Sequence, residues 1–160
     1  MDAGKPRTNR AAVVLAVAAG ALVGTGLYTA DFAEATAYLS SDPKACINCH
    51  VMRDEYDAWM KGPHHNQTCN DCHVPQDFVG KYMTKTEHGY RHSKGFTLQD
   101  FHEPIRITLG SLEVVQANCV RCHEGLVGDI GAAQAHGSEV AETATGCVHC
   151  HAGVGHGPMR

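Results

Sequence analysis

The cysteines of this chain all occur in one pattern. The sequence has 160 residues and eight cysteines, and every cysteine belongs to a Cys-x-x-Cys-His motif. Two thiols at this spacing can bond covalently to the vinyl groups of one haem, while the histidine that follows meets the iron. The pattern therefore predicts four c-type haems and leaves no cysteine for a disulfide. The motif residues are Cys46, Cys49 and His50; Cys69, Cys72 and His73; Cys119, Cys122 and His123; and Cys147, Cys150 and His151.

Zinc is the alternative metal that such residues could bind. Paired cysteines with histidines can hold a zinc ion in a tetrahedral site. Zinc does not require a histidine directly after each second cysteine, whereas all four motifs have one. The spacing therefore favours haem over zinc.

The composition indicates how such a chain folds. Aromatic residues make up 6% of the sequence and its mean hydropathy is −0.25, so little apolar material is available for a core. Four macrocycles would supply apolar surface instead. We expect a mainly α-helical domain with extensive irregular loops wrapped around the haems, and poor folding without them. The net charge of −4 gives no indication of a nucleic-acid surface.

An uncharged segment at residues 11–30 is long enough to cross a membrane as one helix. Lys5, Arg7 and Arg10 precede it and Asp31 follows it. Because basic residues favour the cytoplasmic side, the sequence predicts three parts. These are a cytoplasmic N-terminus at 1–10, a single-pass anchor in the cell membrane at 11–30, and a periplasmic tetrahaem domain at 31–160.

A cleaved signal peptide is the competing interpretation of the same segment. Residues 35–37, Ala-Thr-Ala, are similar to a cleavage site, but the apolar stretch is longer than the usual ~7 to 15 residues of a signal peptide. Gly20 and Gly24 form a Gly-x-x-x-Gly pattern that could pack a second membrane helix and so support a homodimer.

A long helix is predicted in the 50-residue gap between the second and third motifs. Pro75 is tolerated in a first helical turn and Gly95 is a typical stop, which predicts about five turns between them. Lys85, His88 and His92 recur on it at spacings of three and four, so they share one face.

The segments that follow complete the predicted arrangement. Residues 96–110 contain Pro104 and are expected to form an irregular crossover, and residues 111–123 to form the helix that carries the third motif. The glycine-rich C-terminal segment can fold His156 back over a neighbouring haem, because glycine adopts tight turns at little steric cost.

These motifs together resemble a known family. The N-terminal anchor, the four motifs, Met52 two residues after His50 and the segment KGPHHNQTCNDCH at 61–73 resemble the membrane-anchored tetrahaem quinol dehydrogenases. Within that family the chain is most similar to the branch that forms the small subunit of the cytochrome c nitrite reductase complex. The resemblance implies that the chain oxidises menaquinol and passes electrons to a multihaem catalytic subunit, where nitrite is reduced to ammonia.

The resemblance also implies an axial ligand for each iron. It assigns Met52 to haem 1, His73 and His156 to haem 2, His123 to haem 3, and His151 and His64 to haem 4. In this branch the histidine of the first motif, here His50, is turned away from the iron. The second ligand of haem 3 is a lysine of the partner subunit. His65 is an alternative to His64, and His136 could fill the open position on haem 3.

A quinol pocket beside haem 1 follows from the same resemblance. Lys85 matches the lysine that the family places there, whereas the position of the family's acidic residue is occupied by His92. His92 could accept a quinol proton near neutral pH, or it could ligate haem 1 directly. The alternative is that Lys85, Glu87, His88 and His92 only form a solvated or headgroup-facing helix surface.

Three other functions are compatible with the sequence. The acceptor could be a periplasmic nitrate or trimethylamine oxide reductase. A chain released by cleavage would be a soluble tetrahaem carrier without a quinol site. A haem-based sensor would use an open iron position for a small molecule, but the chain shows no separate regulatory domain.

Overall fold

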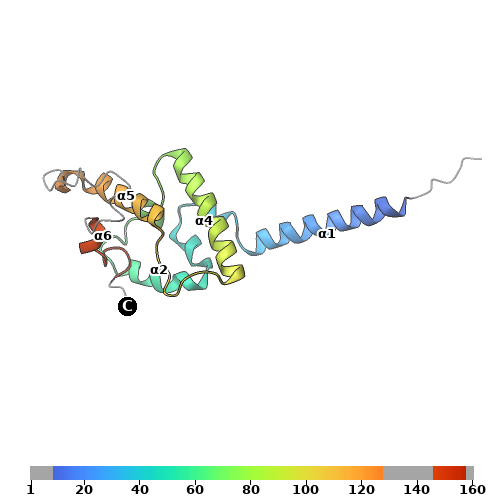
Figure 1. Cartoon of the computed structure of the whole chain (residues 1–160), viewed down its shortest axis with the longest axis horizontal. Coiled ribbons are helices and arrows are strands. Elements are labelled where there is room, and N and C mark those ends of the chain that lie inside the picture. The colour runs from blue at the N-terminus through green and yellow to red at the C-terminus, as the bar shows by residue number, and fades with distance from the viewer. Residues whose placement is uncertain (1–8, 128–145, 158–160) are drawn as a thin grey trace, which may run out of the picture. The chain divides into compact units, whose positions relative to one another are not determined.

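The computed structural model describes residues 9–127 and 146–157, and within these ranges it contains helices and no strands (Figure 1). The chain divides into two compact units, residues 1–36 and residues 37–160. The predicted cytoplasmic residues 1–8 lie outside the described part, including Lys5 and Arg7. The mainly helical fold class predicted from the sequence is therefore correct.

The first unit is one helix, α1 (Arg10–Phe32), of 23 residues. The side chain of Asn9 caps it by accepting a hydrogen bond from the Ala11 N–H at 3.1 Å. At 1.5 Å per residue it is roughly 35 Å long, more than the hydrocarbon thickness of a bilayer. Its most apolar window has a mean hydropathy of 2.0, and none of its side chains is buried. Helix α1 is therefore long and apolar enough to cross a membrane, as the sequence predicts.

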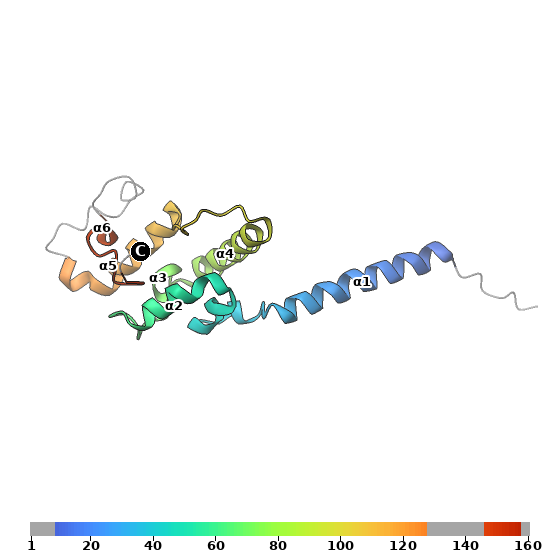
Figure 2. The same cartoon turned by 90° about the horizontal axis from the view of Figure 1, so that it is seen from below.

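The second unit begins with short helical turns and continues with longer helices. The 3-10 turns are η1 (Ala37–Leu39), η2 (Pro43–Asn48) and η3 (His50–Met52). The α-helices are α2 (Arg53–Met60), α3 (Cys69–His73), α4 (Phe78–Leu98), α5 (Leu109–Val127) and α6 (Cys147–Cys150). Helix α5 contacts both α3 and α6, and η1 contacts α4. Figure 2 shows α3 and α6 close to α5.

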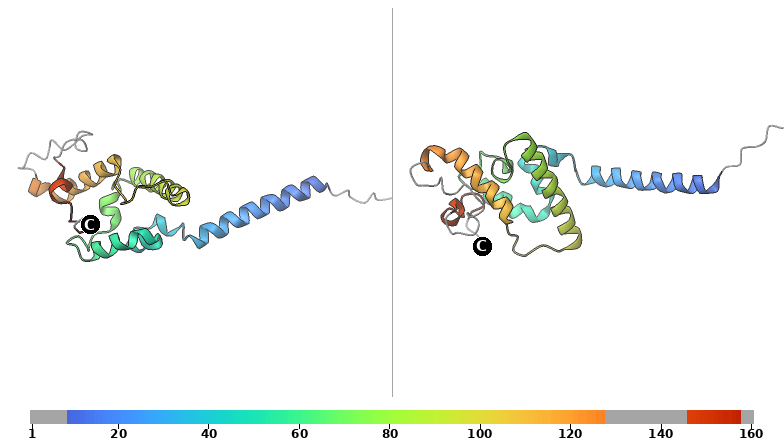
Figure 3. Two further views of the ribbon diagram at one scale, coloured as in Figure 1. Left: turned by 60° about the horizontal axis from the view of Figure 1, so that its bottom comes forward. Right: turned by 45° about the horizontal axis from the view of Figure 1, so that its top comes forward.

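Helix α4 confirms the long helix predicted between the second and third motifs, with shifted ends. It begins at Phe78 and not at Pro75, because the carboxylate of Asp77 accepts a hydrogen bond from the Gly80 N–H at 2.7 Å and caps the helix there. It ends after Leu98, where Gln99 adopts a left-handed conformation with φ of 55°. The segment from 99 to 108 contains no helix and leads to α5, as Figure 3 shows.

The polypeptide supplies almost no hydrophobic core of its own. Among the described residues, Val74 is the one hydrophobic side chain that is buried, at 2% exposure. The other buried side chains are polar or charged: Lys85, Gln116 and Asn118. A domain of this size normally depends on apolar burial for stability. The apolar interior must therefore come from the prosthetic groups that the motifs predict.

This packing predicts that the second unit will not fold without haem. Protein produced in cells that lack the machinery for covalent haem attachment should show much less helical circular dichroism than the holoprotein. It should also be cut by trypsin at many sites, because no compact core protects the backbone. The holoprotein from competent cells is the control. Equal protease resistance of the two forms would contradict the prediction.

Candidate haem sites and their connections

The second, third and fourth cysteine pairs each lie within one α-helix, whereas Cys46 lies on η2 and Cys49 lies between η2 and η3. Cys69 and Cys72 lie on α3, which is capped by a reciprocal pair: Asp71 accepts a hydrogen bond from the Thr68 N–H at 2.7 Å, and the Thr68 side chain accepts one from the Asp71 N–H. The third pair lies on α5 and the fourth on α6. A spacing of three residues places both thiols on the same side of the turn. That is the arrangement needed to hold two substituents of one flat macrocycle.

The donor groups fit haem better than zinc. All eight cysteines are free of disulfide bonds. Within residues 9–127 and 146–157, no three His, Cys, Asp or Glu side chains converge closely enough to hold one metal ion. A structural zinc site requires four such ligands in a tetrahedron. Each motif instead presents two thiols and one following histidine, which suits covalent haem.

The first three motifs lie next to one another. The Cys46 thiol forms a hydrogen bond with Cys69, which lowers the pKa of Cys46 to about 7 and raises that of Cys69. Burial raises the pKa of Cys72, and nearby negative charge, including that of Cys122, raises it further. Helix α3 contacts both η2, which carries Cys46, and α5, so motif 1 lies beside motif 2, and motif 2 beside motif 3.

The fourth motif continues the same series. Burial raises the pKa of Cys119 to about 11, and the Cys147 thiol adds to the rise. Helices α5 and α6 are in contact, so motifs 3 and 4 are also neighbours. Consecutive attachment sites therefore adjoin one another along the domain, as an electron-transfer chain requires.

The rings of His73 and His156, the two ligands predicted for haem 2, lie close together. Their ring centroids are 5.8 Å apart. Two imidazoles bound at about 2 Å on opposite sides of one metal ion have centroids roughly 6 Å apart. The Nδ1 atom of His156 lies 3.0 Å from the carbonyl oxygen of Glu55, which leaves Nε2 free. Desolvation lowers the pKa of His73 to about 4, helped by His156, so its ring is neutral and able to bind metal.

His64 is oriented in a similar way but meets a different ring from the one expected. Its Nδ1 atom lies 3.2 Å from the carbonyl oxygen of Val154, again leaving Nε2 free. Its ring centroid lies 6.1 Å from that of His123. The pairing of His64 with His151 on haem 4 stays a prediction. His65, the alternative ligand, bonds only locally to Gly62 O through Nδ1 at 3.0 Å. His136 lies outside the described residues.

Met52 closes the short helical turn that follows the first motif. It is the last residue of η3, and its N–H donates to Cys49 O at 3.0 Å. Its side chain is partly buried, while His50 on the same turn is exposed. The fold therefore holds both candidate ligands of haem 1 on one turn, and the choice of Met52 stays a prediction.

Lys85 occupies a cage of backbone carbonyl groups. It is 4% exposed, and its ammonium donates to Tyr38 O and Leu39 O at 3.2 Å each and to Ser40 O. Burial lowers the pKa of Lys85, whereas the nearby Cys46 thiolate would raise it. The residue predicted for a quinol pocket thus lies beside the first motif, but its hydrogen bonds go to the segment that precedes this motif.

His88 and His92 stack on the face of α4 predicted from their spacing. Their centroids are 5.8 Å apart with 19° between the planes. His88 Nε2 lies 3.3 Å from the hydroxyl of Ser111, on α5. Desolvation lowers the pKa of His92, and the neighbouring His88 lowers it further. His92 is exposed, and both of its predicted roles, proton acceptor and haem ligand, stay predictions.

No pattern in the sequence predicts the contacts of three further residues in this region. Tyr38 packs against the backbone of Gly89, and burial raises its pKa to about 12, with further increases from Cys46 and Cys49. Gln116 and Asn118 are buried amides on α5 whose partners lie 31 to 46 residues away. Contacts between positions so distant along the chain leave no spacing pattern to detect.

The comparisons with known proteins define the class of this chain. A model of the NapC/NirT cytochrome c family, N-terminal region, matches residues 6–160. The chain belongs to that family of cytochromes. Membership implies covalently bound haem c at the motifs, and together with α1 it indicates a protein anchored in a membrane.

Two individual proteins extend the comparison. The chain is 36% identical over 154 residues to the cytochrome c-type protein NrfH of Wolinella succinogenes, covering 92% of this chain and 85% of the relative. It is also similar to a chain in the crystal structure of the cytochrome c nitrite reductase NrfHA complex bound to the inhibitor HQNO. That match has a TM-score of 0.64 and 27% identity, and it covers 91% of this chain and 92% of the other.

Replacing Met52 tests the predicted ligand of haem 1. An iron bound by one methionine and one histidine has a higher potential than an iron bound by two histidines. Met52→His should therefore lower the potential of one haem by on the order of 0.1 V. Potentiometric titration monitored by absorbance measures it. Met60→His is the control, because Met60 is exposed at the end of α2. Equal potentials in wild type and Met52→His would exclude Met52 as a ligand.

Replacing Lys85 tests the carbonyl cage. Lys85→Met keeps the length of the side chain but removes the ammonium from three carbonyl oxygens, which should cost about 1 to 3 kcal/mol. Denaturant unfolding of the detergent-solubilised holoprotein measures the loss, and proteolysis near Ser41 should become faster. Lys81→Met is the control, since Lys81 donates only to Ser41 Oγ at 3.1 Å. Equal effects of the two variants would contradict a specific role for Lys85.

Proposed function

We propose that the protein is the membrane-anchored tetrahaem cytochrome c that oxidises quinol and passes electrons to the catalytic subunit of a cytochrome c nitrite reductase. The single observation that carries the proposal is the likeness to NrfH. It extends over 92% of this chain and 85% of the relative, so no large part of either protein is unmatched. The four motifs agree with it, because they supply attachment sites for four redox centres.

The haems, when bound, supply the one-electron chemistry, and the polypeptide holds and orients them. The thiol pairs would fix each macrocycle to one short segment of the chain. The Nδ1 contacts of His156 with Glu55 O and of His64 with Val154 O would leave Nε2 of each ring available to bind an iron. We assign His156 opposite His73 on haem 2, His64 with His151 on haem 4, and His123 to haem 3 with its second ligand from the partner.

The donor pocket is proposed beside the first motif. Quinol releases two electrons and two protons, so its site needs a nearby haem and a proton acceptor. Lys85 lies close to Cys46, and His92 lies two turns along the same helix. Because desolvation lowers the pKa of His92, its ring is largely neutral at physiological pH and can take up a proton. We propose menaquinol as the natural donor.

The orientation in the membrane follows from charge. We propose that residues 1–10 are cytoplasmic, that residues 11–30 cross the cell membrane, and that residues 31–160 lie in the periplasm, where haem is attached and the reductase is found. We propose that Gly20 and Gly24, which form a Gly-x-x-x-Gly pattern on α1, pack a second membrane helix in a homodimer within a larger complex.

Anaerobic reduction by a menaquinol analogue tests the function. In purified, membrane-extracted protein the haem absorbance should show reduction, HQNO should block it, and adding a nitrite reductase catalytic subunit with nitrite should reoxidise the haems. His92→Ala should slow the reduction on the order of 100-fold, because it removes the proton acceptor. His102→Ala, an exposed histidine on the 99–108 connection, is the control.

The outcomes separate the candidate functions. Reduction by soluble donors alone would leave a tetrahaem carrier and remove the quinol hypothesis. Reoxidation only by a nitrate or trimethylamine oxide reductase would replace the acceptor. If His92→Ala converts one haem from low-spin to high-spin iron in its electron paramagnetic resonance spectrum, His92 is a ligand of haem 1 and not the proton acceptor.

A further inference from the structure

Two buried amide side chains on α5 connect three of the four haem motifs. Helix α5 itself carries the third motif, with Cys119 and Cys122. Gln116 and Asn118 lie one turn or less before Cys119, at 3% and 7% exposure. Polar side chains are seldom buried unless they form specific hydrogen bonds. Each of these two side chains forms hydrogen bonds with a haem motif that is distant in the sequence.

Gln116 forms hydrogen bonds with the fourth motif through both the oxygen and the nitrogen of its side-chain amide. Its Oε1 accepts a hydrogen bond from the Cys147 N–H at 2.8 Å, and its Nε2 donates to Cys147 Sγ at 3.1 Å. A cysteine sulfur bonded to haem is a thioether, which still accepts a hydrogen bond although it can no longer donate one. The contact therefore keeps its direction after haem attachment, and it fixes both the backbone and the sulfur of Cys147.

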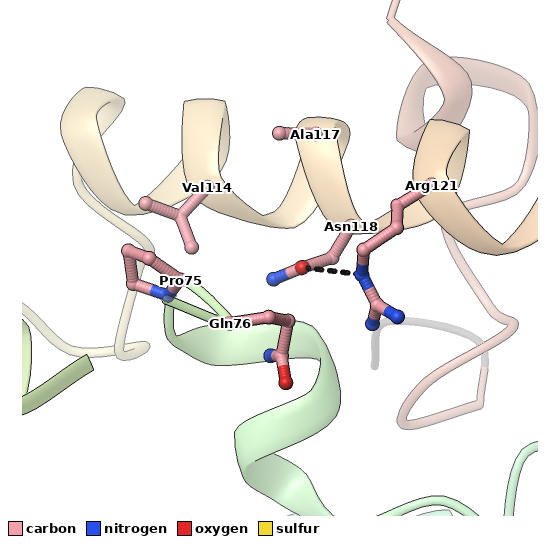
Figure 4. A pocket seen from close by; sticks show the side chains of 6 residues that line it. All are labelled: Pro75, Gln76, Val114, Ala117, Asn118 and Arg121. Atoms are coloured by element: carbon pink, nitrogen blue, oxygen red, sulfur yellow. Dashed lines mark hydrogen bonds between the residues drawn. The ribbon is translucent and has the colours of Figure 1, made fainter. Parts of the chain in front are cut away.

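Asn118 forms hydrogen bonds with the second motif and with the residue that follows it. Its Nδ2 donates to Cys72 O at 3.0 Å and to Val74 O at 2.9 Å. Its Oδ1 accepts from Arg121 Nε at 3.3 Å, as Figure 4 shows, and this contact holds the amide in the correct orientation. The carbonyl groups at Cys72 and Val74 flank His73, the predicted ligand of haem 2. Asn118 therefore determines where the end of α3 lies against α5.

The spacing of the two amides places their partners on different sides of α5. Positions two residues apart on a helix point roughly 200° away from each other. Gln116 reaches α6 and Asn118 reaches the end of α3, and α5 contacts both elements. The cleft of about 260 Å³ beside Asn118, lined in part by Pro75 and Val114, borders the second of these contacts. With a nearly absent hydrophobic core, such contacts decide how the motifs are spaced.

We propose that Gln116 and Asn118 are positioning residues that set haem 4 and haem 2, respectively, against haem 3 on α5. Electron transfer between haems depends on their distance and orientation, so the two amides control the inner part of the electron path. The inference rests on the four covalent haems of the proposed function. It does not depend on the identity of the quinol or of the reductase.

The test uses full-length holoprotein with conservative variants. Gln116→Glu keeps an acceptor for the Cys147 N–H but places a carboxylate oxygen against the sulfur, and Asn118→Asp loses the donor to Cys72 O and Val74 O. Gln116→Leu and Asn118→Leu remove all these bonds. Glu113→Gln, on the exposed side of α5, is the control.

Two measurements apart from activity are made on each variant. Potentiometric titration gives the four potentials, and electron paramagnetic resonance gives the magnetic coupling between neighbouring irons. We expect Gln116 variants to shift the potential of one haem and change its coupling to haem 3, and Asn118 variants to do so for a different haem. Four unchanged potentials and couplings in both conservative variants would overturn the proposal.

Loss of haem in the leucine variants is itself informative. Mass spectrometry of tryptic peptides locates any missing haem. Loss confined to the Cys147–Cys150 peptide for Gln116 variants, and to the Cys69–Cys72 peptide for Asn118 variants, supports the assignment. Loss spread over all four peptides would show general unfolding and overturn it. Because quinol takes no part, failure of quinol oxidation would leave these results unaffected.

Discussion

The attachment of haem to the chain is the interaction on which the rest of the structure depends. Among the described residues Val74 alone is a buried hydrophobic side chain, whereas three buried side chains are polar or charged. Hydrophobic burial normally supplies the main favourable term in folding. Here that term must come from the covalently bound haem that membership of the cytochrome c family implies. The short helices serve chiefly to present the cysteine thiols.

Hydrogen bonds between buried polar side chains and the backbone then fix the arrangement that side-chain packing fixes in other domains. Lys85 holds the segment before the first motif, Asn118 the end of the second and Gln116 the fourth. Such bonds are directional, and an unsatisfied buried partner is costly, so they define one arrangement sharply. An electron-transfer protein benefits from this, since its rates depend on fixed distances between centres.

Hydrogen bonds to the backbone also hold two of the candidate iron ligands. His64 and His156 each turn Nδ1 toward a backbone carbonyl on a different segment, at Val154 and Glu55. The C-terminal segment and the region around α2 therefore hold each other through these two histidines. Outer hydrogen bonds of this kind orient a ligand and increase its basicity. They support the proposal that the C-terminal segment takes part in haem binding.

The sequence by itself determined the chemistry of this protein. The motifs, the apolar segment at 11–30 and the helix around Lys85 are local patterns, and each could be recognised from spacing alone. The start of α4 was misplaced by three residues because Asp77, and not Pro75, caps it. Only the tertiary structure decided that Lys85 is buried among carbonyls, that His64 lies beside His123, and that Gln116 and Asn118 join three motifs. These contacts link residues far apart in the chain, and their geometry depends on how the whole domain closes.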